Sequence, residues 1–133
     1  MKNYSKKLIS MFAIAFTALV LTGCNATPVK NVESNTVPSN VKNSSQVKQA
    51  IITAGAQLGW MIKEVDSKNL QGTLMLRKHV AQISIPYSAK EYSLVHKASE
   101  NLKYDAEENT IHKNYNSWIV NLDRAIQVQL LQQ

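Results

Sequence analysis

The segment that ends at Cys24 constrains this chain most, because it divides the sequence into a leader and a body. Three lysines near the start are followed by a mainly apolar run over residues 8–21. This run is shorter than the roughly 20 residues that a membrane-spanning helix needs. A basic start and a short apolar run are typical of a secretory signal, which we place at residues 1–23. The fold must therefore be built from residues 24–133.

The last four residues of this segment, Leu21-Thr22-Gly23-Cys24, resemble the lipobox of bacterial lipoproteins. The resemblance implies that the Cys24 thiol carries a diacylglyceryl group and that the mature protein is held in a membrane by acyl chains such as palmitate. The alternative is an ordinary signal peptide cut near Ala26. That cut would leave a single free thiol in an oxidising compartment, since Cys24 is the only cysteine. Two or more acyl chains give stable anchoring.

The residue after the lipobox cysteine bears on the destination of the chain. In the sorting rule of enteric lipoproteins, aspartate at this position retains the protein in the inner membrane, and most other residues release it. Asn25 therefore implies the periplasmic face of the outer membrane.

Charge and length limit the classes of protein. Three of the fifteen basic residues precede Cys24, so residues 24–133 carry twelve basic and nine acidic residues, a formal net charge of +3. The lysines are scattered rather than clustered with aromatic residues, so we expect no nucleic-acid partner. Residues 24–133 number 110, and after the tether described next about 85 to 90 of them remain for folding, which suffices for one domain with a modest core.

Residues 25–44 show neither a helical nor a strand period and are rich in Asn, Ser, Thr and Val. We expect a flexible tether here, with a root-mean-square reach of roughly 25 Å. This gives a signal peptide at 1–23, the lipidated cysteine and tether at 24–44, and a globular domain at 45–133.

Hydrophobic spacing predicts a helix at the start of that domain. Ser44 or Ser45 is placed to cap it, and Gly59 to end it. Gly55 lies within the helix and suggests close packing against a neighbouring element. The apolar stripe of this helix consists of Val47, Ala50, Ile51, Ala54 and Leu58.

After Gly59 the hydrophobic period changes from helical spacing to two. We expect strands around Trp60–Ile62, 73–77, 81–87 and 92–98, with a turn at 67–72 and a tight reversal at Lys78-His79. Pro86 suggests a strand end or an edge strand. Short strands joined by short loops predict an antiparallel meander.

The strongest period begins at Ile111 and continues to Leu130. It predicts a long amphipathic helix, capped by Asn109 or Thr110 after a polar connection at 99–108. The predicted fold is α+β, a single small domain in the order α-β-β-β-β-α. Its antiparallel meander carries the N-terminal and C-terminal helices on one face.

Three segments together resemble a family of small proteobacterial lipoproteins of uncharacterised function. They are Gly59-Trp60, residues 77–85 (RKHVAQISI), and residues 101–104 with 111–122 (NLKY and IHKNYNSWIVNL). The resemblance covers roughly residues 50–131 and implies no established activity. Relatives often have Arg before the Gly-Trp pair, Pro-Gly in the first turn and Tyr at the position of His96. Here those positions hold Leu58, Lys68-Asn69 and His96.

The best candidate binding residues surround the start of the last helix. His112 and Asn116 are four residues apart and share a helix face, and Asn101 and Tyr104 lie in the loop that leads there. A histidine with several amides can bind a small polar ligand or a glycan. The alternative is structural: these side chains bond loop carbonyls and hold the helix start in place.

Metal and catalytic chemistry find little support in the sequence. His79, His96 and His112 lack the spacing of a zinc site, so we expect no metal and no cofactor. No nucleophile motif, phosphate loop or acid/base pair stands out, and we assign no catalytic residue. The leading expectation is a non-enzymatic envelope lipoprotein that binds another envelope protein. A ligand-binding or glycan-binding module is second, and a minor envelope enzyme is third.

Overall fold

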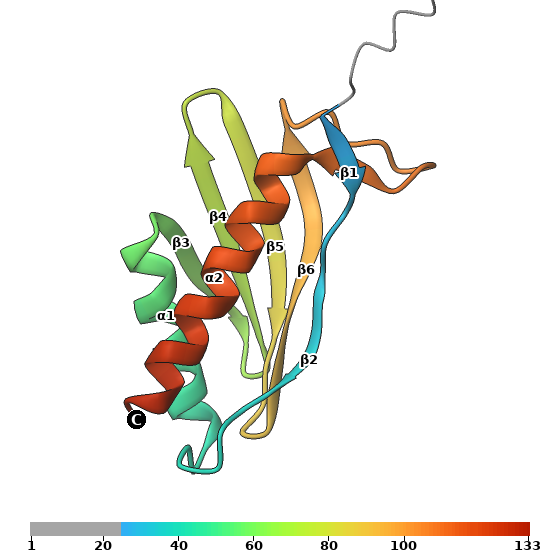
Figure 1. The fold of residues 1–133 in the computed structure, drawn as a ribbon. Helices are drawn as coiled ribbons and strands as arrows, with labels where there is room; N and C mark the ends of the chain where they lie inside the picture. The colour runs from blue at the N-terminus through green and yellow to red at the C-terminus, as the bar shows by residue number, and fades with distance from the viewer. Residues whose placement is uncertain (1–24) are drawn as a thin grey trace, which may run out of the picture.

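Alternating apolar residues in four consecutive segments build a sheet with one buried face. The computed structural model describes residues 25–133, and it shows a small α+β domain with a five-stranded antiparallel sheet and two helices (Figure 1). The predicted α+β class is confirmed. The sheet has the order β2-β6-β5-β4-β3. Its strands are β2 (Val32–Thr36), β3 (Trp60–Asp66), β4 (Asn69–Leu76), β5 (His79–Pro86) and β6 (Glu91–Glu100).

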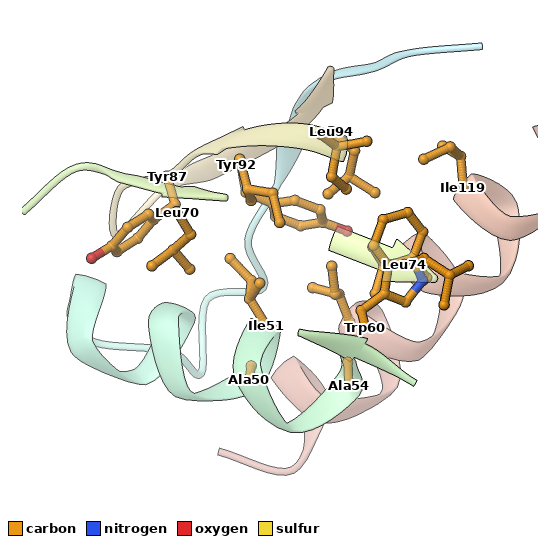
Figure 2. Close-up of a cluster of buried hydrophobic side chains, with 14 of the residues drawn as sticks. Ala50, Ile51, Ala54, Trp60, Leu70, Leu74, Tyr87, Tyr92, Leu94 and Ile119 are labelled. Atoms are coloured by element: carbon orange, nitrogen blue, oxygen red, sulfur yellow. The ribbon is translucent and has the colours of Figure 1, made fainter. Parts of the chain in front are cut away.

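The two helices are α1 (Ser44–Gln57) and α2 (Lys113–Leu131). The predicted order α-β-β-β-β-α is incomplete, because β1 (Ala26–Pro28) and β2 precede α1, β2 adds a fifth strand to the sheet, and β7 (Thr110–His112) precedes α2. In Figure 1, α2 crosses the sheet diagonally, and α1 lies beside the C-terminal half of α2. Between the helices and the sheet lies a core in which Ala50, Ile51 and Ala54 of α1 point toward Leu70 and Tyr92 (Figure 2). Three aromatic residues are part of this core: Trp60 of β3, Tyr92 of β6 and Tyr87, which directly follows β5, are buried.

The boundaries of α1 follow from its capping residues. The Asn43 side chain accepts a hydrogen bond from the Gln46 amide at 3.0 Å, so the cap lies one residue before the predicted serines. Gly59 follows the helix with φ +82°, as expected of a residue that ends a helix. A Cβ on Gly55 would lie 2.6 Å from Ile62 Cγ1, which confirms close packing at this position.

The prediction of a flexible tether at 25–44 is wrong for the residues that the structure describes. Residues Ala26–Pro28 form β1, which pairs with β7 (Thr110–His112), and β2 adds an edge strand beside β6. Two valines of this segment, Val37 and Val41, are buried in the core. The valines are too widely spaced to show a strand period, and the segment is held largely by polar side chains. We call residues 25–43 the N-terminal strap.

Three smaller predictions also differ from the structure. The turn expected at 67–72 is shorter, because the Asp66 carboxylate accepts from the Lys68 amide at 2.8 Å and β4 begins at Asn69. The reversal before β5 lies one residue earlier, with Arg77 at φ +55° in place of a glycine. Residues 110–112, predicted as a helix start, form β7 because they pair with β1.

Candidate functional site

The predicted site residue with the most hydrogen bonds is Asn116, in the first turns of α2. Its Oδ1 accepts from the Lys30 amide at 2.9 Å, and its Nδ2 donates to Thr27 Oγ1 at 2.9 Å and to the Pro28 carbonyl at 2.8 Å. A side-chain amide offers two donors and one acceptor oxygen. Both ends of Asn116 are therefore engaged by the N-terminal strap, which it fixes to α2.

His112 is the N-cap of α2 and the last residue of β7. Its Nδ1 accepts from the Asn114 amide at 3.2 Å, and its own amide donates to the Leu102 carbonyl at 2.8 Å. His112 also lies opposite Ala26 in the β1–β7 pair. The residue thus joins the strap, the preceding loop and the helix.

Asn101 and Tyr104 lie on the loop that precedes β7. The Asn101 Nδ2 donates to the Lys78 carbonyl at 2.6 Å, and its carbonyl lies 2.7 Å from His79 Nδ1. The Tyr104 ring is exposed and packs on His96, with ring centroids 4.3 Å apart. Asn101 therefore fastens the loop to the β4–β5 turn, and Tyr104 covers a histidine of β6.

The four candidate residues consequently serve different contacts. His112 and Asn116 bond the strap and the helix start, whereas Asn101 and Tyr104 bond or cover β4–β6. The hollow that Asn116 borders, about 270 Å³, is otherwise lined by Ser117, Val120 and Asn121. A ligand held by the Asn116 amide would have to replace its bonds to the strap.

His96 connects this region to the core. Its ring meets Tyr115 edge-on at 5.3 Å, and its Nε2 lies 3.1 Å from Ser99 Oγ. Burial lowers the pKa of His96 and raises the pKa of Tyr115. Among the side chains of residues 25–133, the Tyr115 hydroxyl is the buried polar group that has no hydrogen-bond partner.

A second polar cluster, which the sequence analysis missed, centres on the Tyr92 hydroxyl. This hydroxyl donates to Asp123 Oδ1 at 2.6 Å and accepts from Asn35 at 3.1 Å and from Gln127 at 2.9 Å. Burial, followed by the bond to Asp123, raises the pKa of Tyr92. Asn35 also donates to Asp123 at 2.8 Å, so the cluster fixes β2 to α2. Its members are far apart in the sequence, and their spacing gave no signal of it.

A pair of hollows lies beside Tyr87, at the end of the domain that holds the β3–β4 and β5–β6 turns. Two hollows of about 350 and 380 Å³ share Lys68, Tyr87 and Ser88 on their walls. The Tyr87 amide donates to the Lys68 carbonyl at 2.9 Å, which joins the two turns. One ammonium and several hydroxyls can contact a small polar molecule. The sequence predicts Lys68 and Ser88 in turns and Tyr87 at the end of a strand, where its ring could line a cleft or pack in the core.

Residues 25–133 contain no group of three or more His, Cys, Asp or Glu side chains placed to hold a metal ion. Neither helix in that range is long and apolar enough to cross a membrane. The signal segment 1–23 and Cys24 lie outside the described residues.

Comparison with protein-family models, with curated proteins and with solved structures finds no match to this chain.

Proposed function

We propose that the protein is an envelope lipoprotein, anchored through acyl chains on Cys24 at the periplasmic face of the outer membrane. In this proposal it is a non-enzymatic binding or assembly-supporting module. The observation that carries the anchor is the Leu-Thr-Gly-Cys motif after a basic and apolar leader. The start of the described domain is compatible with this anchor, because β1 begins two residues after Cys24.

The surface proposed to bind a partner is the sheet face opposite the core. Met61, Val65 and Met75 lie at positions of β3 and β4 that alternate with buried ones, and their side chains are 50, 62 and 63 % exposed. Val80 and Val95 continue this face on β5 and β6 as half-buried residues. We call these five residues the outer face. Exposed apolar residues gathered on one face mark interaction sites more often than isolated ones do.

The β3 edge of the sheet is a poorer candidate than the outer face. β3 is an edge strand, but it carries a charged Lys63 and an irregular register between Glu64 and Asp66. Charges and bulges are the usual protection of an edge against pairing with another chain. We therefore place the partner, another protein of the envelope, across the outer face.

The anchor is tested by a Cys24→Ser variant of the full chain. The wild-type protein should stay with membranes after a high-salt wash, and the variant should appear in the soluble fraction. The variant's retention on washed membranes would overturn the anchor. Far-ultraviolet circular dichroism of the released protein shows whether it is folded.

The partner surface is tested by photocrosslinking in cells of the native host. A photoreactive residue at Met61, Val65 or Met75 should give the same crosslinked protein, identified by mass spectrometry. Val128 is a matched control, because it is 48 % exposed but lies on α2. A crosslinking pattern at Val128 equal to that of the outer face would contradict this assignment.

A further inference from the structure

The chain leaves the described domain at one defined end. The Asn25 carbonyl accepts a hydrogen bond from the Lys113 amide at 2.9 Å, so Asn25 is fixed to the start of α2. Cys24 is joined to Asn25 by a single peptide bond, and consecutive Cα atoms lie about 3.8 Å apart. A lipid anchor on Cys24 therefore brings this end of the domain to the membrane surface, without a spacer.

Hydrogen bonds identify the segments that share this end. The His112 amide donates to the Leu102 carbonyl at 2.8 Å, which places the loop after β6 beside the helix start. Asn101 in turn bonds the Lys78 carbonyl in the β4–β5 turn. Figure 1 shows β1 and the β4–β5 turn at one end of the molecule and the C-terminus at the other.

The exposed side chains of these segments are basic and apolar. Arg77, Lys78, Lys103 and Lys113 are all exposed. Two hydrophobic side chains lie among them: Leu76 is 48 % exposed and Tyr104 is 42 % exposed. Basic side chains are attracted to anionic headgroups, and tyrosine is favoured at the interface between water and lipid.

Acidic groups are also present near this end. Glu100 is exposed at the end of β6, and Glu107 and Glu108 lie at the tip of the loop before β7. The amides of both tip residues donate to the Asp105 carboxylate, which shapes a tight turn. This loop projects to the side of the domain in Figure 1, away from the β4–β5 turn. Glu100 and Asp105 remain on the end itself, so its four basic residues outnumber its two acidic ones.

We infer that Leu76, Arg77, Lys78, Lys103, Tyr104 and Lys113 form a surface that docks on phospholipid headgroups, which we call the anchor-end surface. The inference rests on the proposed anchor at Cys24 and adds an orientation to it. The domain lies directly on the bilayer with its β4–β5 turn toward the lipid and its C-terminus pointing away. Anchoring and docking then act together, because the anchor keeps the local concentration of lipid high.

The test uses the full lipidated protein in vesicles of phosphatidylethanolamine and phosphatidylglycerol. Acylation consumes the only native thiol, so a Leu76→Cys variant carries a single free thiol for a fluorescent label. Leu131→Cys is the matched control, because Leu131 is also exposed but lies at the C-terminal end. With nitroxide-bearing lipids, the label at residue 76 should lose at least half of its fluorescence, and the label at residue 131 should lose little.

The outcomes separate the docking from the anchor. If the protein floats with the vesicles but both labels are quenched equally little, docking is overturned and the anchor stands. If the lipidated chain does not float with the vesicles at all, the proposed anchor itself is overturned. An Arg77→Glu/Lys78→Glu variant of the Leu76→Cys protein should show at least a twofold loss of quenching while still floating. Unchanged quenching would overturn the role of these two charges.

Discussion

At the scale of single residues, polar side chains decide where the N-terminal strap lies. The Tyr92 hydroxyl takes part in three hydrogen bonds that come from β2 and α2, and one of them goes to a carboxylate. Hydrogen bonds to charged groups are stronger than neutral ones. Tyr92 thus joins three elements that hydrophobic packing alone would leave free to slide.

Replacing Tyr92 by Phe should lower the free energy of unfolding by about 1–3 kcal/mol, because Asp123 and Gln127 lose a buried partner. Tyr87→Phe is the matched control: Tyr87 is also buried, and removing its hydroxyl should change the free energy by less than about 0.5 kcal/mol. Urea unfolding measures both. Equal losses of unfolding free energy in the two variants would show that the hydrogen bonds of the Tyr92 hydroxyl do not stabilise the fold.

His96 makes stability depend on pH. Burial lowers its pKa below the ordinary value of about 6.5, so the unfolded chain takes up this proton before the folded one does. The stability that neutral His96 contributes is present above pH 6.5 and is lost as the pH falls through the lowered pKa. His96→Phe should therefore unfold with a weaker pH dependence between pH 7 and pH 5. Melting temperatures that fall equally in both proteins would contradict this assignment.

At the scale of elements, α1 can pack close against β3 because Gly55 has no side chain. The Cβ of an alanine at position 55 would lie 2.6 Å from Ile62 Cγ1, a distance at which one element must move. The close approach of α1 to β3 therefore depends on a glycine whose cost to the helix is about 1 kcal/mol.

Gly55→Ala should destabilise the domain by about 1–3 kcal/mol, because overpacking exceeds the gain in helix propensity. Ala56→Gly, at the next and exposed position, should cost about 1 kcal/mol by propensity alone. Chemical denaturation of both variants separates the two effects. A stabilised Gly55→Ala protein would mean that the helix and the strand can separate freely.

Asn116 is the residue of α2 that holds the N-terminal strap in place. Asn116→Ala removes three bonds to residues 27–30, so the Lys30 amide should exchange with deuterium at least about tenfold faster. Asn121→Ala, at an exposed position of the same helix, is the control and should leave that rate unchanged. Equal protection of Lys30 in the two variants would show that the strap is held mainly by β1–β7 pairing.

The elements differ in how far the sequence predicts them. The helical stripe of α1 as far as Ala54, the alternating residues of β5 and β6, and the stop at Gly59 are local patterns, and they were predicted correctly. Leu58 was wrongly included in that stripe: the helix ends at Gln57, and Leu58 is exposed. β1, β2 and β7 were not predicted, because each is short and polar and forms only by pairing with a distant segment. The same reason applies to the site: the loop and helix positions of Asn101 and Asn116 were readable, but their partners Lys78 and Pro28 were not.

At the scale of the whole molecule, the N-terminal strap is part of the folded domain. A chain that begins at Ser44 would lack β1 and β2, would leave the β6 edge unpaired and would lose the contacts of Val37 and Val41. The folding unit in the described part therefore starts at its first residue and not at the predicted boundary of 45.

Removing residues 25–43 should lower the melting temperature by at least about 10 °C relative to a chain that begins at Asn25, because 1 kcal/mol corresponds to several degrees in a domain of this size. The shortened protein should also associate through the uncovered β6 edge. Differential scanning calorimetry and size-exclusion chromatography measure the two effects. A shortened chain that has the same melting temperature as the longer one and stays monomeric would show that the strap is only a tether.

The pairing of β1 with β7 has a consequence for the order in which the elements assemble. The strap is synthesised first, but its partners β6, β7 and α2 belong to the second half of the chain. A contact between distant segments cannot form before both exist, and closing so long a loop is slow. The sheet edge is therefore completed last, and the strap reaches its final position only after β6, β7 and α2 have been made.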